Sequence, residues 1–173
     1  MNQKKITVRR GNPGDLNALV AFNQAMALET ENKRLRNDVI TSGVSAVLND
    51  PNRGLYFIAT LKDAERDRNI KAESIAGALM LTFEWSDWRN GRFWWIQSVY
   101  VDPAQRRKGV YSHLHRHVKT LSREDPSCCG IRLYVEEENI SAQQTYIHLG
   151  MYKTRYHLFE EEYPCDAPDE SVS

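Results

Sequence analysis

Three cationic side chains stand directly before a glycine in residues 105–112, QRRKGVYS. They are Arg106, Arg107 and Lys108, with Gly109 next. A strand-like VYVDP precedes them and a helical pattern follows, so this stretch marks the start of a helix. The first amides of a helix lack acceptors within the helix, and with the helix dipole they attract anions. The stretch therefore favours phosphate binding, although cations at a helix start are more often solvated surface charge.

Two other phosphate-binding patterns do not fit this stretch. A nucleotide-hydrolase P-loop needs Lys and then Ser or Thr after its last glycine, whereas Val110 and Tyr111 follow Gly109 here. A dinucleotide fingerprint needs three glycines, and this turn has one. Gly109 by itself still allows a pyrophosphate to approach the backbone closely, because it has no Cβ.

The elements that must position this turn alternate between strand and helix signals. A β-branched run, ITVRR, comes first, and Asn12-Pro13-Gly14-Asp15 then predicts a turn and a helix start. Apolar spacing predicts a helix after residue 15, a second helix over 39–48, and a third on the stripe of Val110, Leu114, Val118 and Leu121. Strands are predicted in GLYFIATL, IAGALMLTFEWS, RFWWIQSVYV, IRLYVEE and YKTRYHLFEEEY, with an exposed connection, KDAERDRNIKAE, after the first of these.

Two local signals set further expectations. Asn90-Gly91 predicts a two-residue hairpin turn, because both residues tolerate positive φ, and that register places Glu84 across from Gln97. Late in the chain, either Asn139 or Ser141 caps a helix, and Gly150 suits the left-handed position after its end. Pro126 and Gly130 are expected to break the chain before IRLYVEE.

Two stretches in this order, IQSVYVDPAQRRKGVYSHL and LYVEEENISAQQTYIHLGMY, resemble the GNAT superfamily of acyl-CoA-dependent N-acyltransferases. The resemblance implies an α/β fold, with a central, mixed but mostly antiparallel twisted sheet flanked by helices. It also implies acetyl-CoA as the acyl donor, with no metal.

The resemblance assigns roles to residues of this chain. Arg106 and Gly109 match the family's pyrophosphate pattern, whereas Tyr111 replaces a small residue. Val99 and Val101 match strand residues whose backbone pairs with the pantetheine arm, as a ligand added to a strand edge would. Tyr146 matches the tyrosine that protonates the leaving thiolate, although core packing alone also explains it. The residues expected to bind the donor are Val99, Val101, Arg106, Arg107, Lys108, Gly109, Val110, Tyr111 and Asn139.

The catalytic base is expected outside the family's position. Gln97 aligns where many relatives carry a glutamate, and glutamine cannot accept a proton at neutral pH. The hairpin register offers Glu84 instead, acting from the neighbouring strand through a water. The alternatives are a solvent-facing Glu84, or an amine that arrives unprotonated.

The acceptor side has weaker signals. Glu29 in MALETENKRL is a candidate partner for a cationic amine, and Trp85 and Gln97 are candidate pocket residues at the long hairpin. A solvated helix surface and aromatic core packing explain Glu29 and Trp85 equally well. His113 and His117 have helical metal-ligand spacing but no accompanying acid, so no metal site is expected.

Composition sets the remaining expectations. The 173 residues carry 23 Lys and Arg against 23 Asp and Glu, which gives no reason to expect a nucleic acid or a membrane as partner. Three cysteines without metal-ligand spacing suit reduced thiols in a cytoplasmic protein, and no apolar run resembles a signal or a membrane span. We expect one domain over residues 1–162 and a disordered acidic tail over 163–173.

The sequence therefore predicts an acetyl-CoA-dependent N-acetyltransferase that acetylates a primary amine of a small or amino-acid-like acceptor, by direct transfer in a ternary complex. The alternative is a non-catalytic module that binds or senses acyl-CoA. A homodimer is compatible with the exposed aromatic residues of the hairpin.

Overall fold

The computed structural model describes residues 5–62, 74–161 and 163. These fall into two compact units, residues 1–134 and residues 135–173, and each is described by itself. The predicted connection KDAERDRNIKAE lies outside the described residues except for its first residue. The predicted tail lies outside them except for Tyr163. No helix among the described residues is both long and apolar enough to cross a membrane.

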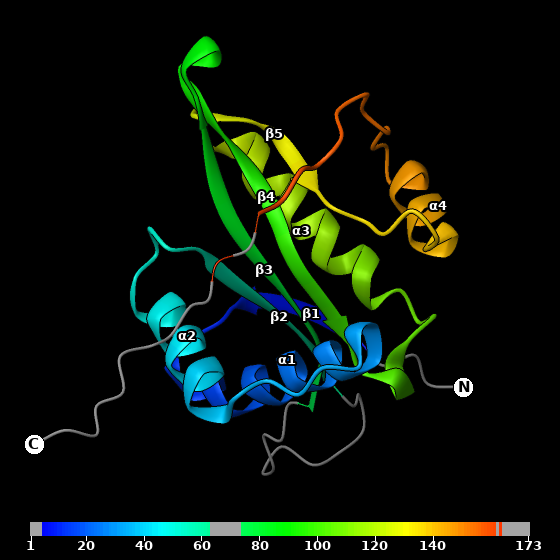
Figure 1. Ribbon diagram of the computed structural model, residues 1–173. Coiled ribbons are helices and arrows are strands. Elements are labelled where there is room, and N and C mark those ends of the chain that lie inside the picture. The colour runs from blue at the N-terminus through cyan, green and yellow to red at the C-terminus, as the bar shows by residue number, and fades with distance from the viewer. Residues whose placement is uncertain (1–4, 63–73, 162, 164–173) are drawn as a thin grey trace, which may run out of the picture. The chain divides into compact units, whose positions relative to one another are not determined.

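The first unit is built on one five-stranded sheet, with the strands in the order β1-β2-β3-β4-β5 (Figure 1). Neighbouring strands run antiparallel from β1 to β4, and β5 pairs parallel to β4. This confirms the mixed, mostly antiparallel sheet predicted from the sequence. The strands are β1 Lys5–Arg10, β2 Leu55–Lys62, β3 Ser74–Ser86, β4 Gly91–Val101 and β5 Cys128–Leu133.

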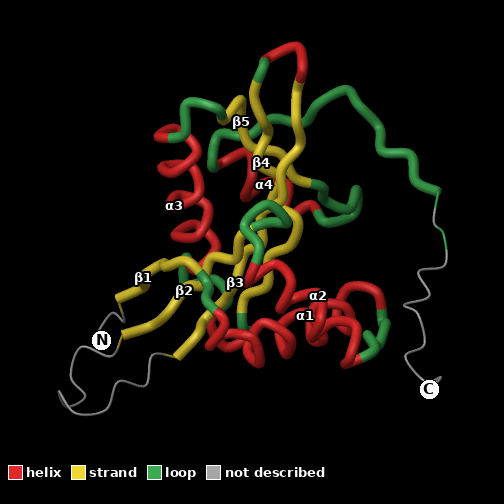
Figure 2. The backbone as a smooth tube through the Cα atoms, turned by 90° about the vertical axis from the view of Figure 1, so that its left-hand side faces the viewer, coloured by secondary structure: helices red, strands yellow, loops and turns green. Residues whose placement is uncertain are grey.

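Helices cover both faces of the sheet (Figure 2). On one face lie α1, Leu16–Glu31, and α2, Asn37–Asn49, which pack Leu19 and Val44 against Tyr56 and Ile58. Asn12 caps the 3₁₀ turn Pro13–Asp15, which precedes α1, by accepting the amide hydrogen of Gly14 (2.9 Å). The predicted helices in this region are thus confirmed, with bounds a few residues wider.

The opposite face is covered by α3, Val110–Glu124. Val110, Leu114 and Val118 are each at most 2% exposed, as the predicted stripe requires, and each contributes about 1.5–3 kcal/mol by burial. Sequence reasoning missed His115, which is also 2% exposed. Burial lowers the pKa of this imidazole, and the charge of Lys119 lowers it further. The buried stripe fixes where α3 begins, and with it the position of Gly109.

The β3–β4 hairpin differs from its predicted register. A 3₁₀ turn over Asp87–Arg89 and a left-handed Asn90 (φ 46°) join the strands, so that Ser86 pairs with Gly91. The expected two-residue turn was wrong, because the 3₁₀ turn and Asn90 together form a four-residue loop. Gly91 is instead the first residue of β4, where a Cβ would lie 2.6 Å from the sulfur of Cys129.

This shift moves the candidate base. Glu84 pairs with Phe93, so the prediction that it faces Gln97 was wrong. Gln97 is an extra residue in β4: Met80 pairs with Ser98 and Leu81 with Ile96, which leaves Gln97 opposite neither. Such a β-bulge bends its strand and interrupts pairing. No local turn signal in the sequence marks it.

The second unit contains α4, Ile140–His148. Asn139, rather than Ser141, caps it by accepting the amide hydrogen of Ala142 (3.1 Å), and Gly150 adopts the predicted left-handed conformation (φ 89°). Two strand predictions at this end of the chain were wrong. Residues 152–161 form no strand, and β5 starts at Cys128, includes Gly130 and stops at Leu133.

Candidate functional site

One edge of β4 is unpaired beyond the bulge. The β4–β5 pairing runs from Arg92 with Cys128 to Ile96 with Leu133 and ends there, immediately before Gln97. Within the described residues, Ser98 to Val101 pair only with β3. The bulge and the end of β5 together leave an open strand edge, which is what a ligand with amide groups needs in order to bind as an added strand.

The backbone of Val99 and Val101 points toward this open edge. Asp102 donates its N–H to the carbonyl of Ala76 (3.0 Å), so Asp102 and Tyr100 bond toward β3. Backbone groups alternate between the two edges of a strand, so Val99 and Val101 must point the other way. The carbonyl of Val101 accordingly accepts a hydrogen bond from Arg106 Nε (3.0 Å). Both residues have the orientation that the predicted pantetheine pairing requires.

The loop between β4 and α3 leads into a helix start whose first amides have no acceptor within the helix. A 3₁₀ turn over Pro103–Gln105 is capped by Asp102, and both Arg107 (φ 61°) and Gly109 (φ 82°) are left-handed. The first helical hydrogen bond runs from the His113 N–H to the Gly109 carbonyl (3.1 Å), so the amides of residues 110–112 have no acceptor within the helix. Left-handed residues before a helix create a concave group of amides that suits an anion.

Gly109 is required here by its backbone conformation and not by crowding. A Cβ at this position would meet its nearest atom, His113 Nδ1, at 3.8 Å, an ordinary contact. The positive φ is what disfavours any other residue.

The three cationic side chains of the loop differ in their hydrogen-bond partners. Lys108 is bound by the loop itself, donating to the carbonyl of Ala104 (2.7 Å) and to the Gln105 side chain (3.2 Å). Arg106 binds the Val101 carbonyl and the carboxylate of Glu29. Arg107 has neither a hydrogen bond nor an ion pair with any described residue, and it is exposed. Sequence alone does not separate these three roles.

Glu29 connects α1 to this loop. One carboxylate oxygen accepts the hydroxyl of Tyr100 (2.7 Å) and the other accepts Arg106 Nη2 (2.5 Å). The hydrogen bond from Tyr100, followed by the one from Arg106, lowers the pKa of Glu29. The expected partner of a cationic amine is therefore already paired with an expected ligand of the diphosphate. The sequence did not single out Tyr100, because an aromatic residue within a strand is unremarkable there.

The side chains of Val110 and Tyr111 belong to the core. Val110 is a core residue at 2% exposure, and Tyr111 packs against the same core with its hydroxyl buried. The Tyr111 ring lies 5.9 Å from that of His115, between centroids. The tyrosine that departs from the family pattern therefore has its side chain in the core.

The candidate base Glu84 and the candidate acceptor residues Trp85 and Gln97 do not form one site. Glu84 accepts hydrogen bonds from Arg132 Nη1 (2.7 Å) and from the Trp95 indole N–H, and the Arg132 guanidinium lies over the Phe93 ring at 3.5 Å. This cluster gives Glu84 a structural role that the sequence did not indicate, since its partner Arg132 comes from β5.

Trp85 and Gln97, the two candidate acceptor residues on the hairpin, lie far from each other. Trp85 is 63% exposed and pairs with Arg92 near the hairpin tip, about 16 Å along β4 from Gln97. Gln97 lies in the bulge, where its side-chain oxygen accepts the hydroxyl of Thr82 (3.3 Å). Trp85 therefore does not share a pocket with Gln97.

Asn139 and Tyr146 lie on the second unit. Asn139 is the cap of α4, and Tyr146 is half-buried on the same helix. Burial raises the pKa of the Tyr146 phenol.

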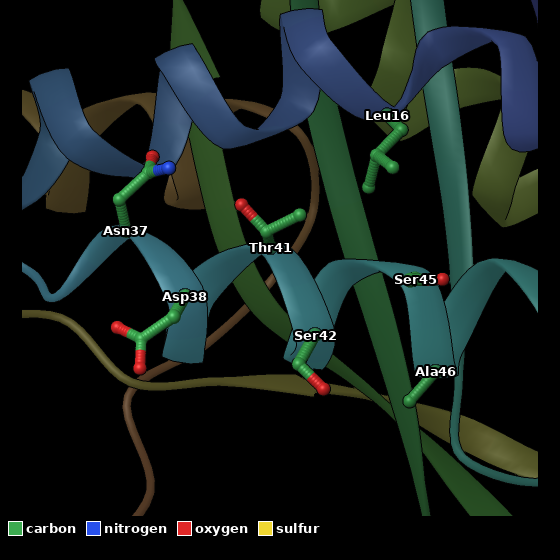
Figure 3. A pocket seen from close by; sticks show the side chains of 7 residues that line it. All are labelled: Leu16, Asn37, Asp38, Thr41, Ser42, Ser45 and Ala46. Atoms are coloured by element: carbon green, nitrogen blue, oxygen red, sulfur yellow. The ribbon is translucent and has the colours of Figure 1, made fainter. Parts of the chain in front are cut away.

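A separate hollow of about 570 Å³ lies between α1 and α2 (Figure 3). Asn37 and Thr41 point from α2 toward α1, whereas Asp38 and Ser42 point away. None of its lining residues belongs to β4 or to the loop that follows β4. The lining residues are Leu16, Asn37, Asp38, Thr41, Ser42, Ser45 and Ala46.

Comparison with known proteins agrees with this geometry. A family model described as acetyltransferase (GNAT) family matches residues 22–151, most of the chain. This chain belongs to the GNAT acetyltransferase family. A solved structure of a possible acetyltransferase from Clostridium difficile 630 is 42% identical over 92% of this GNAT chain and 98% of that one, with a TM-score of 0.80.

A more distant solved structure shares the GNAT fold only. It is the aminoglycoside N-acetyltransferase AAC(6')-Iy in complex with CoA, 14% identical over 93% of this chain and 97% of that one, with a TM-score of 0.71. No curated protein matches the chain significantly.

Proposed function

We propose that this GNAT protein transfers the acetyl group of acetyl-CoA to a primary amine of a small or amino-acid-like acceptor, directly and within a ternary complex. One observation carries the proposal. The open edge of β4 at Val99 and Val101 is followed, after the loop of residues 102–109, by the amides of residues 110–112, which have no acceptor within α3. An amide-bearing arm and a diphosphate, joined in one molecule, match those two features in that order.

The donor site is proposed as follows. Val99 and Val101 pair with the pantetheine arm, and the amides of residues 110–112 bind the diphosphate together with Arg106 and the exposed cation of Arg107. Asn139 takes the place near the pantetheine that the family resemblance gives it. Val110 and Tyr111 act through the backbone, since their side chains pack in the core.

The reaction forms one bond and breaks one. The neutral amine nitrogen attacks the thioester carbonyl carbon, the tetrahedral intermediate collapses, and the carbon–sulfur bond breaks. Tyr146 gives its phenolic proton to the leaving thiolate, the role that the family resemblance gives it. The amine loses its proton to water. We do not propose Glu84 as the base, because its carboxylate is held by Arg132 and Trp95 and lies away from the bulge.

Thiol release from acetyl-CoA, measured with a panel of amino acids, polyamines and aminoglycosides, tests the proposal. We expect turnover with at least one primary amine, and Tyr146→Phe should lower kcat about 100-fold with CoA affinity unchanged. Tyr152→Phe is the matched control, since Tyr152 is 85% exposed in the same unit. CoA binding without turnover on any amine, and no effect of Tyr146→Phe, would instead favour an acyl-CoA sensor.

A further inference from the structure

The Arg106 guanidinium is occupied on two of its three nitrogens. Nε donates to the Val101 carbonyl (3.0 Å), and Nη2 donates to Glu29 (2.5 Å). The guanidinium carbon also lies over the Tyr100 ring, 5.5 Å from its centroid. Arginine grips a phosphate with two parallel N–H donors. With Val101 and Glu29 bound, two of the five N–H groups of Arg106 are engaged, including the pair on Nε and Nη2, and its charge is already balanced by a carboxylate.

Glu29 is held in place from its other side. The Tyr100 hydroxyl binds its second oxygen at 2.7 Å, and the Tyr100 ring packs against Phe22 of α1, with centroids 5.1 Å apart. The carboxylate is thus fixed at the C-terminal end of α1 whether or not Arg106 stays with it. An anion fixed beside the proposed diphosphate site both occupies Arg106 and repels the ligand.

We propose that Glu29 competes with the diphosphate of the donor for Arg106. This carboxylate therefore lowers donor affinity, and its bond to Arg106 breaks when the donor binds. The inference rests on the proposed function for the identity of the donor. It reassigns Glu29 from an acceptor ligand to a residue that acts through Arg106. Because coupling between two sites is reciprocal, a cation that binds Glu29 once Arg106 has left it increases donor affinity by the factor by which the donor increases the affinity for that cation.

The test is the affinity for CoA, measured by calorimetry at fixed ionic strength with full-length protein. Glu29→Gln keeps an acceptor for Tyr100 but removes the charge that holds Arg106, and we expect it to bind CoA about two- to fivefold more tightly than wild type. A residue that merely positioned Arg106 for the donor would give the opposite sign, because its loss weakens binding.

Glu31→Gln is the matched control. It removes the same charge two residues along α1, from a carboxylate that has no ion pair or hydrogen bond with any described residue. Residues two apart on a helix point in nearly opposite directions. We expect its CoA affinity to equal that of wild type. Equal gains in Glu29→Gln and Glu31→Gln would reduce the effect to net charge and overturn the competition.

A double variant isolates the path through Arg106. In an Arg106→Ala background, adding Glu29→Gln should change CoA affinity by less than about 1.5-fold, because no guanidinium is left to compete for. A gain as large as that in wild type would overturn the proposal, and melting curves establish that each variant is folded. Wild-type protein that binds no CoA would remove the donor site itself, an outcome separate from a failure of the competition alone.

Discussion

Gly109 provides the sharpest test of the donor site, because one position controls both a backbone conformation and the surroundings of the diphosphate. Its φ of 82° and ψ of 10° place it in the left-handed region at the N-cap of α3. A Cβ added there meets nothing closer than His113 Nδ1 at 3.8 Å. Alanine and glutamate therefore carry the same backbone cost and similar contacts at Cβ, and they differ in charge.

The backbone cost can be estimated from the conformation. A non-glycine residue in the left-handed region costs about 1–2 kcal/mol, so Gly109→Ala should lower the Tm by about 2–8 °C for a chain of this size. The added charge of Gly109→Glu acts on the ligand. A carboxylate about 6 Å from one phosphate charge costs about 0.7 kcal/mol at the dielectric constant of water and about 2.8 kcal/mol at an effective value near 20. CoA affinity should therefore fall by a further factor of about 3 to 100 relative to Gly109→Ala.

The assay pairs calorimetric titration of CoA with thermal unfolding of the same samples. Gly43→Ala is the matched control, because Gly43 lies inside α2 with no atom within 4 Å of an added Cβ. It should raise the free energy of unfolding by about 0.5–1 kcal/mol and leave CoA affinity unchanged. If Gly109→Glu and Gly109→Ala bind CoA equally well, the diphosphate does not lie at this helix start and our assignment of the loop is refuted.

Two further variants test the surrounding structure. Glu84→Gln should cost about 0.2–1 kcal/mol of stability through the pair with Arg132 and leave the pH dependence of kcat/KM unchanged; loss of the acidic limb of that profile would restore Glu84 as the base. Ser127 first, and Arg92 second, lower the pKa of Asp125 from 3.8 to about 2. The carboxylate therefore stabilises the fold above about pH 4, and this stability is lost as the pH falls through 2. Asp125→Asn should cost about 1 kcal/mol at pH 7 after allowance for solvent screening, and in urea titrations its difference from wild type should shrink as the pH falls from about 4 through 2.

The sequence by itself determined the features that depend on neighbouring residues. The helical stripe of Val110, Leu114 and Val118 and the left-handed Gly150 are local features, and the structure confirms them. The cap of α4 was narrowed to Asn139 or Ser141, and the structure decides for Asn139. The order of strands and helices follows from the same short-range periodicity. The fold was predicted from the two stretches that resemble the GNAT superfamily. Local patterns failed at YKTRYHLFEEEY, because strand propensity without a pairing partner does not make a strand.

Only the tertiary structure decided how residues far apart in the chain meet. The bulge at Gln97 depends on how β4 fits between β3 and β5, and with the end of β5 it leaves the edge of β4 open from Ser98 to Val101. The contact of Glu84 with Arg132 depends on the hairpin register and on the pairing of β5 with β4. The pairing of Glu29 with Arg106 joins residues 77 positions apart. Side-chain contacts of this kind arise from the packing of whole elements against the sheet, and no spacing along the chain encodes them.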